Sequence, residues 1–316
     1  MKARSARVVT MVAVSWLLQL AGPGASPIQA DDPQSVFFSF NGDGAADLAI
    51  GVAYEDIGGD DAAGAVNVLY GRRAGGLSAT DNQFWHQAVI GVLDSADPWD
   101  HFGYALALGD FDGDTYLDLA VGIPYEDVGD KVDSGAVHVL YGTAIGLSAA
   151  GDQFWHQDVS TADGAVEGSC EDYDHFGFAL AVGDFNGDGY DDLAIGVPTE
   201  DLVVNDQGVI NVLYGSNSGL TAAGDQLWHQ DSINVEDTAA LGDSFGKSRA
   251  AGDFDGDGYD DLAVGVPNED VRGFADAGAV HVLYGTASGL SANRDQFWHQ
   301  NSSGVQDSLE ANDRFG

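Results

Sequence analysis

The sequence repeats itself four times with a period of about 70 residues. The tripeptide Trp-His-Gln occurs at four places spaced 70, 73 and 70 residues apart, and Phe-Gly recurs at spacings of 74, 69 and 70 residues. An octapeptide of the form Gly-Ala-Val-His-Val-Leu-Tyr-Gly also recurs, with small variations, in every copy. Three independent marks that share one period indicate a repeat architecture, in which each unit is one supersecondary element that stacks on its neighbours.

Each unit contains four short apolar segments separated by turn residues. In the second unit these are FGYALALGDF, DLAVGIP, GAVHVLYG and DQFWHQ. Such segments, bounded by Gly and Asp and rich in Val, Leu, Tyr and Phe, are typical of strands, and none shows a sustained helical period. The sequence therefore predicts an all-β protein whose four-stranded units form the blades of a β-propeller. The units cover about residues 36–87, 102–157, 176–230 and 245–300, and another unit begins at 315.

The turn between the first two strands of a unit carries candidate metal ligands. It reads DFDGDTYLD over 110–118, DFNGDGYDD over 184–192 and DFDGDGYDD over 253–261. Side-chain oxygens at loop positions 1, 3, 5 and 9 and a backbone carbonyl at position 7 can surround one ion. Calcium prefers six to eight hard oxygen ligands in flexible geometry, whereas magnesium prefers rigid octahedral sites. Zinc is disfavoured because the loops contain neither Cys nor His.

These loops begin like an EF-hand but do not continue like one. An EF-hand has a Glu at position 12, where this chain has Val121, Ile195 or Val264. The first unit is degenerate, because Ser39 replaces the first Asp and leaves Asn41, Asp43 and Asp47 as candidate ligands. We therefore expect about three strong calcium sites and a fourth, weaker one. The alternative interpretation is a set of solvated Asp-Gly turns without metal.

The N-terminus has the pattern of a secretory signal peptide over residues 1–30. Three basic residues precede an apolar run from Val8 to Ala21, and the small-residue stretch GPGASPIQA follows. The run is too short to span a bilayer, and we expect no membrane span in the mature chain, residues 31–316. Cleavage near Ala30 or near Ala25 would deliver a secreted protein, either extracellular or periplasmic. A buried N-terminal helix is the alternative.

Charge and cysteine content exclude several kinds of partner. The chain has 51 acidic and 11 basic residues, and its formal net charge is −40. This balance argues against nucleic acid, which requires a basic surface, and against anionic membranes. Cys170 is the single cysteine, so no intrachain disulfide can brace the fold. Bound metal would fill that role.

The order Phe-Gly, calcium loop, Gly-x-Pro resembles the FG-GAP repeat. Gly-x-Pro stands at 122–124, 196–198 and 265–267, and the first unit has Gly-Val-Ala at 51–53. FG-GAP repeats build the N-terminal propeller of integrin α subunits and accompany a catalytic domain in a phospholipase D. The resemblance implies calcium loops on one face and ligand contacts on the opposite face. The implied metal ligands are Asp110, Asp112, Asp114, Tyr116 and Asp118; Asp184, Asn186, Asp188, Tyr190 and Asp192; and Asp253, Asp255, Asp257, Tyr259 and Asp261, each tyrosine through its backbone carbonyl.

The number of units departs from the family pattern. Integrin propellers close with seven blades, whereas this chain offers about four. Three interpretations are open: a fragment of a seven-bladed propeller, a closed four-bladed ring, or an open array that closes by self-association. An open array would leave edge strands exposed.

The resemblance favours a binding or adhesion module for an extracellular protein or glycan, with structural calcium. An extracellular hydrolase or lyase acting on polysaccharide or lipid anchors, or an accessory domain of one, is the alternative, and a structural spacer is a third. No catalytic set stands out from the repeats. Unit-specific loop residues such as Trp99 and the segment around Cys170 are candidate contacts. His138 and His281, which share a strand position with Asn67 and Asn211, fit a polar face of the sheet.

Overall fold

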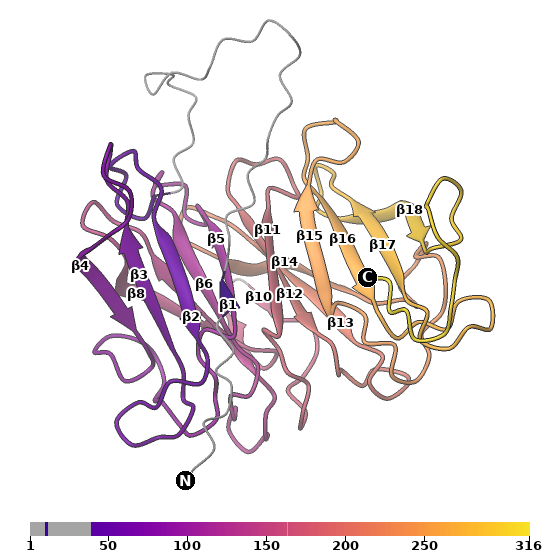
Figure 1. Cartoon of the computed structure of the whole chain (residues 1–316), viewed down its shortest axis with the longest axis horizontal. Coiled ribbons are helices and arrows are strands. Elements are labelled where there is room, and N and C mark those ends of the chain that lie inside the picture. The colour runs from indigo at the N-terminus through magenta and orange to yellow at the C-terminus, as the bar shows by residue number, and fades with distance from the viewer. Residues whose placement is uncertain (1–9, 12–38, 163) are drawn as a thin grey trace, which may run out of the picture.

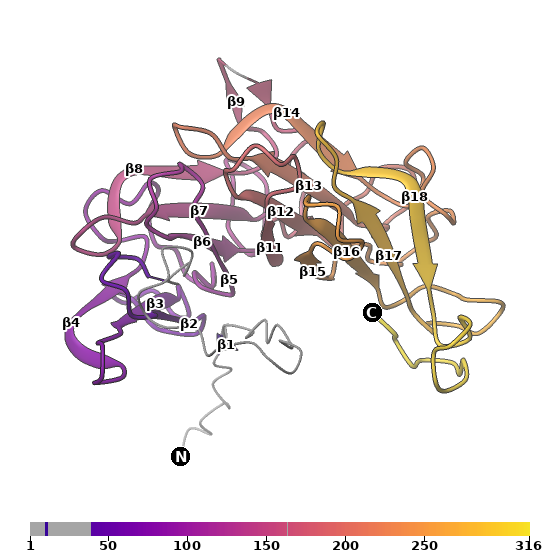
Figure 2. The ribbon, with the colours of Figure 1, turned by 90° about the horizontal axis from the view of Figure 1, so that it is seen from above.

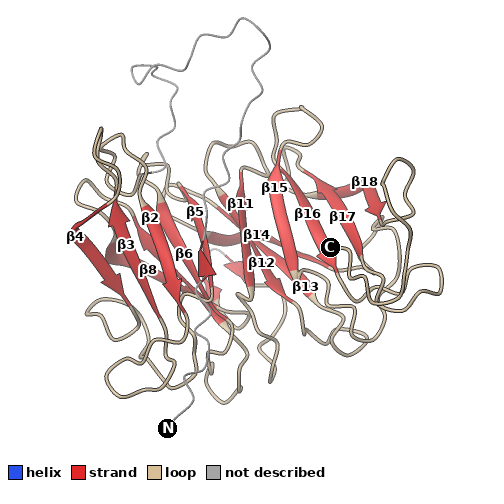
Figure 3. Cartoon of the chain, viewed as in Figure 1, coloured by secondary structure: helices blue, strands red, loops and turns tan. Residues whose placement is uncertain are grey.

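The computed structural model describes residues 10–11, 39–162 and 164–316, and these residues contain strands and loops but no helix (Figure 3). The prediction of an all-β chain is therefore confirmed. The predicted signal peptide lies outside the described residues except for Thr10 and Met11. These two residues form the short strand β1 (Thr10–Met11), which pairs with β2 (Leu48–Val52).

Four antiparallel sheets of four strands follow one another along the chain. The first sheet comprises β1, β2, β3 (Ala65–Tyr70) and β4 (Ser78–Trp85). The second comprises β5 (Ala105–Gly109), β6 (Asp118–Ile123), β7 (Ala136–Tyr141) and β8 (Ser148–Trp155). The third comprises β11 (Ala179–Gly183), β12 (Asp192–Val197), β13 (Val209–Tyr214) and β14 (Thr221–Trp228). The fourth comprises β15 (Ser248–Gly252), β16 (Asp261–Val266), β17 (Ala279–Tyr284) and β18 (Ser291–Trp298), and the small pair β9 (Ser160–Thr161) and β10 (Gly164–Ala165) lies between the second and third sheets in the chain.

The four sheets stand side by side like the blades of a propeller (Figure 1). Seen from above, they form an arc, with the first strand of each sheet on the concave side and the last strand on the convex side (Figure 2). The first and fourth sheets lie at the two ends of the arc and do not meet. The described residues therefore have a propeller-like arrangement, and the closed four-bladed ring is not formed.

The core lies between neighbouring sheets. Apolar residues of β3 pack against β6, those of β7 against β12, and those of β13 against β16. Strands β6, β7, β12 and β13 are buried along their whole length, because each has a sheet on both sides. This explains why segments such as DLAVGI are continuously apolar and do not alternate with polar residues.

The Phe-Gly pair joins each sheet to the preceding one. Phe102 is fully buried, and its backbone N–H donates at 2.9 Å to the carbonyl oxygen of Ala63, in the loop just before β3. A Cβ added at Gly51 would collide with the carbonyl oxygen of Gly103, and one at Gly122 would collide with that of Gly177. The glycine of Gly-x-Pro is therefore required by the close approach of the next unit's backbone.

A tyrosine–glutamine pair makes a second joint between sheets. Gln153 on β8 donates through Nε2 to the carbonyl oxygen of Leu220 at 2.9 Å and accepts the backbone N–H of Leu220 at 3.1 Å. The hydroxyl of Tyr141 donates to the same amide oxygen at 2.6 Å. The same contacts join Gln83 to Leu147 and Gln226 to Leu290. Residues more than 60 positions apart are thereby linked in each successive unit.

Replacing Gly122 by Ala should destabilise the chain by about 1–3 kcal/mol, because the new methyl group overlaps the backbone of the third sheet. Gly75→Ala is the matched control, since a Cβ there meets only the Cβ and carbonyl oxygen of Arg72, at 3.3 and 3.8 Å. Urea unfolding followed by tryptophan fluorescence measures both variants. Equal midpoints for Gly122→Ala and the parent would contradict this account of the joint.

Candidate metal centre

The predicted metal loops connect the first and second strands of each sheet. In the second sheet, Gly109 at the end of β5 pairs with Asp118 at the start of β6. The same pairing joins Gly183 to Asp192 and Gly252 to Asp261. Because the two strands are antiparallel neighbours, the first and ninth loop positions meet at one end of the sheet.

The loop of the second sheet gathers three carboxylates. Asp110, Asp112 and Asp114 each offer an oxygen within 4.8 Å of the others. Oδ1 of Asp110 is buried and has no hydrogen-bond partner. The backbone N–H groups of Thr115 and Tyr116 donate to Asp110 and Asp114, both at 2.9 Å, and hold these side chains in place. A buried oxygen without a partner, beside two further carboxylates, fits a calcium ion bound by these residues.

The ninth-position aspartates are buried and hydrogen-bonded through both oxygens. Asp118 accepts the backbone N–H groups of Phe111 and Gly142, each at 2.8 Å. Asp47, Asp192 and Asp261 make the same two contacts in their own units. Burial raises the pKa of Asp118 and of Asp192 to about 8, although these hydrogen bonds oppose the shift. A neighbouring cation would favour the charged form of both.

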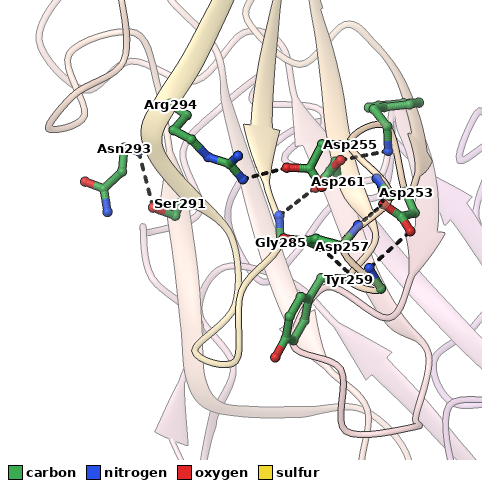
Figure 4. A network of polar contacts seen from close by, with 12 residues as sticks. Asp253, Asp255, Asp257, Tyr259, Asp261, Gly285, Ser291, Asn293 and Arg294 are labelled. Atoms are coloured by element: carbon green, nitrogen blue, oxygen red, sulfur yellow. Dashed lines mark hydrogen bonds and ion pairs between the residues drawn. The ribbon is translucent and has the colours of Figure 1, made fainter.

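The fourth sheet also gathers three carboxylates, but its set is different. Asp253, Asp255 and Asp261 each offer an oxygen within 4.8 Å of the others. The third member of this set is the ninth-position Asp261, whereas in the second sheet it is the fifth-position Asp114. Arg294 from β18 reaches Asp255, with 2.6 Å between Nη2 and Oδ2 (Figure 4). Asp257 accepts the backbone N–H of Tyr259 at 3.1 Å. The guanidinium of Arg294 therefore already supplies positive charge at this loop.

The loop of the third sheet is organised around its first residue. Asp184 accepts the backbone N–H groups of Gly187, Asp188 and Gly189 at 2.7, 3.1 and 3.0 Å. Asn186 accepts a backbone N–H from Asp188 at 2.8 Å. The backbone N–H of Tyr190 donates to Asp188 at 3.0 Å. The predicted ligands of this unit thus line one compact turn.

In the first unit, a hydroxyl group and a guanidinium group lie beside the candidate ligands. The Ser39 hydroxyl lies 2.9 Å from Oδ1 of Asn41 and 3.3 Å from Oδ2 of Asp47, and its one proton is available to either oxygen. Asp43 accepts a backbone N–H from Ala45 at 2.8 Å. The guanidinium of Arg73 lies over Gly44 of the same loop. The weaker calcium site in this unit stays a prediction.

Two aspartates that the sequence analysis did not single out link the loops of successive sheets. Oδ2 of Asp191 accepts the backbone N–H of Asp110 at 2.8 Å, and the backbone N–H of Asp191 donates to the carbonyl oxygen of Asp110 at 3.1 Å. Asp260 does the same for Asp184 at 3.1 and 3.0 Å. The sequence signal for this contact is an Asp at the eighth loop position. The loops of the third and fourth sheets have one there, whereas the loop of the second sheet has Leu117.

The tyrosines at the seventh loop position add a packing contact. The ring of Tyr190 lies against Gly113 of the preceding loop, where a Cβ would meet ring carbon Cε1 at 2.6 Å. Tyr259 lies against Gly187 in the same way. The glycine at the fourth loop position is therefore needed for the neighbouring tyrosine as well as for its own positive φ. The predicted metal loops of successive sheets therefore lie next to one another at the same end of the sheets.

A family model described as FG-GAP repeat matches residues 102–140, 176–213 and 245–283. This chain therefore contains three FG-GAP repeats. It is 32% identical to integrin alpha-PS2 of Drosophila melanogaster over 59% of this chain and 13% of that protein. It is 33% identical to phosphatidylinositol-glycan-specific phospholipase D of Rattus norvegicus over 54% of this chain and 19% of that protein.

The chain thus spans less than a fifth of the length of these two curated relatives. Among solved structures, rhamnogalacturonan lyase PL11 of Bacillus licheniformis matches with a TM-score of 0.43 and 12% identity, over 87% of this chain and 50% of that one. Within the described residues, no helix is long and apolar enough to cross a membrane.

Several other predicted residues are structural. Among the tryptophans of Trp-His-Gln, Trp85 and Trp155 are buried in the core, Trp228 is partly buried and Trp298 is 36% exposed. The prediction that His138 and His281 lie on a polar face is wrong. Both are fully buried and lie 3.1 and 2.9 Å from the carboxylates of Asp152 and Asp295. The strand position is enclosed because the link from the preceding sheet covers it, and the backbone N–H groups of Leu93 and Glu236 in these links donate to the same two aspartates.

Cys170 does not have the properties of a nucleophile. It is a free, buried cysteine whose sulfur lies 3.6 Å from Nδ1 of His156. Burial raises the pKa of the thiol and lowers that of the imidazole, so both favour their neutral forms. A thiol becomes reactive when its pKa is lowered. The pair is better understood as part of the packing.

Removing calcium with EDTA should lower the Tm by about 5 °C or more at pH 8. The decrease in Tm should be smaller at pH 5. The folded-state pKa of Asp118 and Asp192 is about 8, so protons bound at pH 5 stabilise the calcium-free fold, and this contribution disappears as the pH rises through 8. Differential scanning calorimetry at both pH values measures this. Superimposable melts with and without EDTA at pH 8 would refute it.

Replacing Arg294 by Gly should strengthen calcium binding at the fourth loop by about threefold to tenfold, because the competing guanidinium is removed. Gly151 and Gly224 occupy this position in the second and third units, so the backbone accepts glycine. Isothermal titration calorimetry at low salt measures the affinity. Arg272→Gly removes the same charge from the opposite end of the sheet and should leave the affinity unchanged. Weaker binding in Arg294→Gly would contradict the competition.

Proposed function

We propose that this chain is an exported, calcium-stabilised propeller module that binds an extracellular protein or glycan. The calcium is structural, and the ligand binds at the sheet ends opposite to the metal loops. In an antiparallel four-stranded sheet, the connections between strands one and two and between strands three and four share one end. The connection between strands two and three and the link to the next sheet therefore share the other end, which we call the contact face.

Two exposed aromatic residues on the contact face carry the proposal. Trp99 and Tyr173 are 58% and 56% exposed, and their φ angles are 78° and 75°. Gly242 and Asn312, which tolerate positive φ, occupy the same position before the next two Phe-Gly pairs. A bulky side chain in this region costs about 1–3 kcal/mol. Since neither ring is buried in the core, the fold gains little from them, and binding gives these side chains a reason to be present.

Further aromatic rings extend from Trp99 along the contact face. The Trp99 ring lies 6.3 Å from His101, which lies 4.8 Å from Tyr125, and Tyr125 lies 5.0 Å from His175. Tyr54 of the first sheet also contacts His101 at 4.5 Å. Neither ring nitrogen of the buried His101 has a hydrogen-bond partner. The row spans the first three sheets and offers aromatic surface, as binding sites commonly do.

The test is binding of the purified chain to glycan arrays and to arrays of extracellular-matrix proteins. Trp99→Gly/Tyr173→Gly should reduce the signal of any bound ligand at least tenfold while preserving the melting curve, because glycine suits both backbone positions. Ile145→Ser is the matched control, since Ile145 is 90% exposed at the metal-loop end and the other units carry Ser218 and Ser288 there. Ligand binding that survives the double substitution and fails in Ile145→Ser would reverse the assignment of faces.

A further inference from the structure

The three interfaces between neighbouring sheets are built from the same two sets of residues. The preceding sheet supplies a phenylalanine from its metal loop, the tryptophan of Trp-His-Gln and a glutamine. The following sheet supplies the turn between its third and fourth strands, which ends in a leucine. The backbone N–H of Thr143 in this turn donates to the carbonyl oxygen of Phe40 at 3.1 Å. The same bond recurs at the next two interfaces, from Ser216 to Phe111 and from Thr286 to Phe185.

The fourth sheet carries the residues of a preceding sheet, and they are exposed. Beyond β18, residues 299–316 form no further strand. Phe254 is 52% exposed, whereas the corresponding phenylalanines of the other three sheets are at most 1% exposed. Trp298 is 36% exposed, whereas Trp85 and Trp155 are 8% and 3% exposed. Gln296 is exposed as well.

The first sheet carries the turn of a following sheet, and this turn is exposed too. Leu77 is 49% exposed, whereas the corresponding leucines of the other three sheets are each 3% exposed. Arg72 occupies the position of Thr143 and is also exposed. We call residues 72–77 the outer turn of the first sheet. Each end of the arc therefore presents the half of the interface that is missing at the other end.

The two ends also carry opposite charges. At the interfaces within the chain, the turn residue that donates to the preceding metal loop is a threonine or a serine. In the first sheet this residue is Arg72. The metal loop of the fourth sheet, residues 253–261, contains five aspartates. The same interface between the two ends would set a guanidinium against this acidic loop, and complementary charges favour association.

We propose that the fourth sheet of one copy of this chain binds the first sheet of a second copy. Phe254, Trp298 and Leu77 become buried together in this contact. Gln296 binds the backbone of Leu77 as Gln153 binds that of Leu220, through an amide N–H donated to the carbonyl oxygen and an amide oxygen that accepts the N–H. The second copy is the partner because its outer turn reproduces an interface that each chain already forms three times.

Two copies close into a ring. The contact joins two different faces, so each copy keeps one further end free, and such head-to-tail contacts close when the rotation allows it. The four sheets of one copy form an arc that is open on one side, where the second copy fits (Figure 2). Two copies of four sheets give eight blades, which is within the range of propellers. Closure leaves neither end of either arc exposed.

The test is the mass of the full chain in calcium-containing buffer, measured by sedimentation equilibrium over a range of concentrations. The proposal predicts a mass twice that of one chain and no larger species, because a closed ring has no free end. Monomers would overturn the proposal and leave the two ends to units of another chain. Assemblies that keep growing with concentration would also overturn it.

Leu77→Glu and Trp298→Glu each change both contacts of the ring, since every contact uses one first sheet and one fourth sheet. Each variant should raise the dissociation constant of the dimer at least tenfold, because a charge would be buried in an apolar contact. Both side chains are exposed within one chain, so the fold should persist, and circular dichroism checks this. Two variants that dimerise as tightly as the parent would overturn the proposal.

An equimolar mixture of these variants distinguishes head-to-tail contacts from contacts between like ends. One contact of the mixed dimer joins the unchanged fourth sheet of the Leu77→Glu chain to the unchanged first sheet of the Trp298→Glu chain. Mixed dimers should therefore form at the highest concentration at which each variant alone is monomeric. A mixture that stays monomeric there would overturn the proposal.

Ile145→Glu is the matched control for the added charge. Ile145 is 90% exposed and lies in the corresponding turn of the second sheet, away from both ends of the arc. This variant should dimerise with the dissociation constant of the parent. A loss of dimer equal to that in Leu77→Glu would overturn the proposal, because general charge repulsion would then explain both results.

Discussion

Clustered carboxylates organise the loop ends of these sheets, and their mutual repulsion is the constraint on which the fold depends. Asp118 and its counterparts join each metal loop to the ends of two strands, while Asp191 and Asp260 join each loop to the one before. Asp110 takes part in both arrangements, because its backbone pairs with Asp191 and its side chain belongs to the carboxylate cluster. A cation in this loop would therefore stabilise a sheet and its junction with the next one.

The two ends of the sheets differ in how much they vary between units. At the metal-loop end, the glycine at the fourth loop position and the ninth-position aspartate recur in all four units, and this aspartate makes the same two backbone hydrogen bonds in each. At the contact face, the Phe-Gly joint recurs, as does a hydrogen bond from the Trp-His-Gln glutamine of one sheet to a glutamate of the next. The residue three positions before Phe-Gly changes from Trp99 to Tyr173 to Gly242. The repeated residues thus hold neighbouring sheets together. The residues that differ between units lie between these contacts, on loops, where binding residues of repeat proteins are commonly found.

The strands and the metal loops were predictable because their signals are local. Four apolar segments with Gly/Asp turns specify a four-stranded sheet, and the loop positions follow from spacing. The contacts between units were not predictable in this way. Gln153 meets Leu220, and Asp191 meets Asp110, across more than 60 residues of chain, and no local pattern announces such pairs. The burial of His138 was missed for the same reason, because the link from the preceding sheet covers a face that one unit alone would leave open.

We expect cations to occupy the carboxylate loops of the second, third and fourth sheets. The most direct measurement is a crystal structure of the chain grown in calcium, with anomalous difference density collected at long wavelength. If cations are bound, each loop will show a peak with oxygen ligands at about 2.3–2.6 Å, and in the second sheet these will include Oδ1 of Asp110. Well-ordered loops without anomalous peaks at saturating calcium would contradict it.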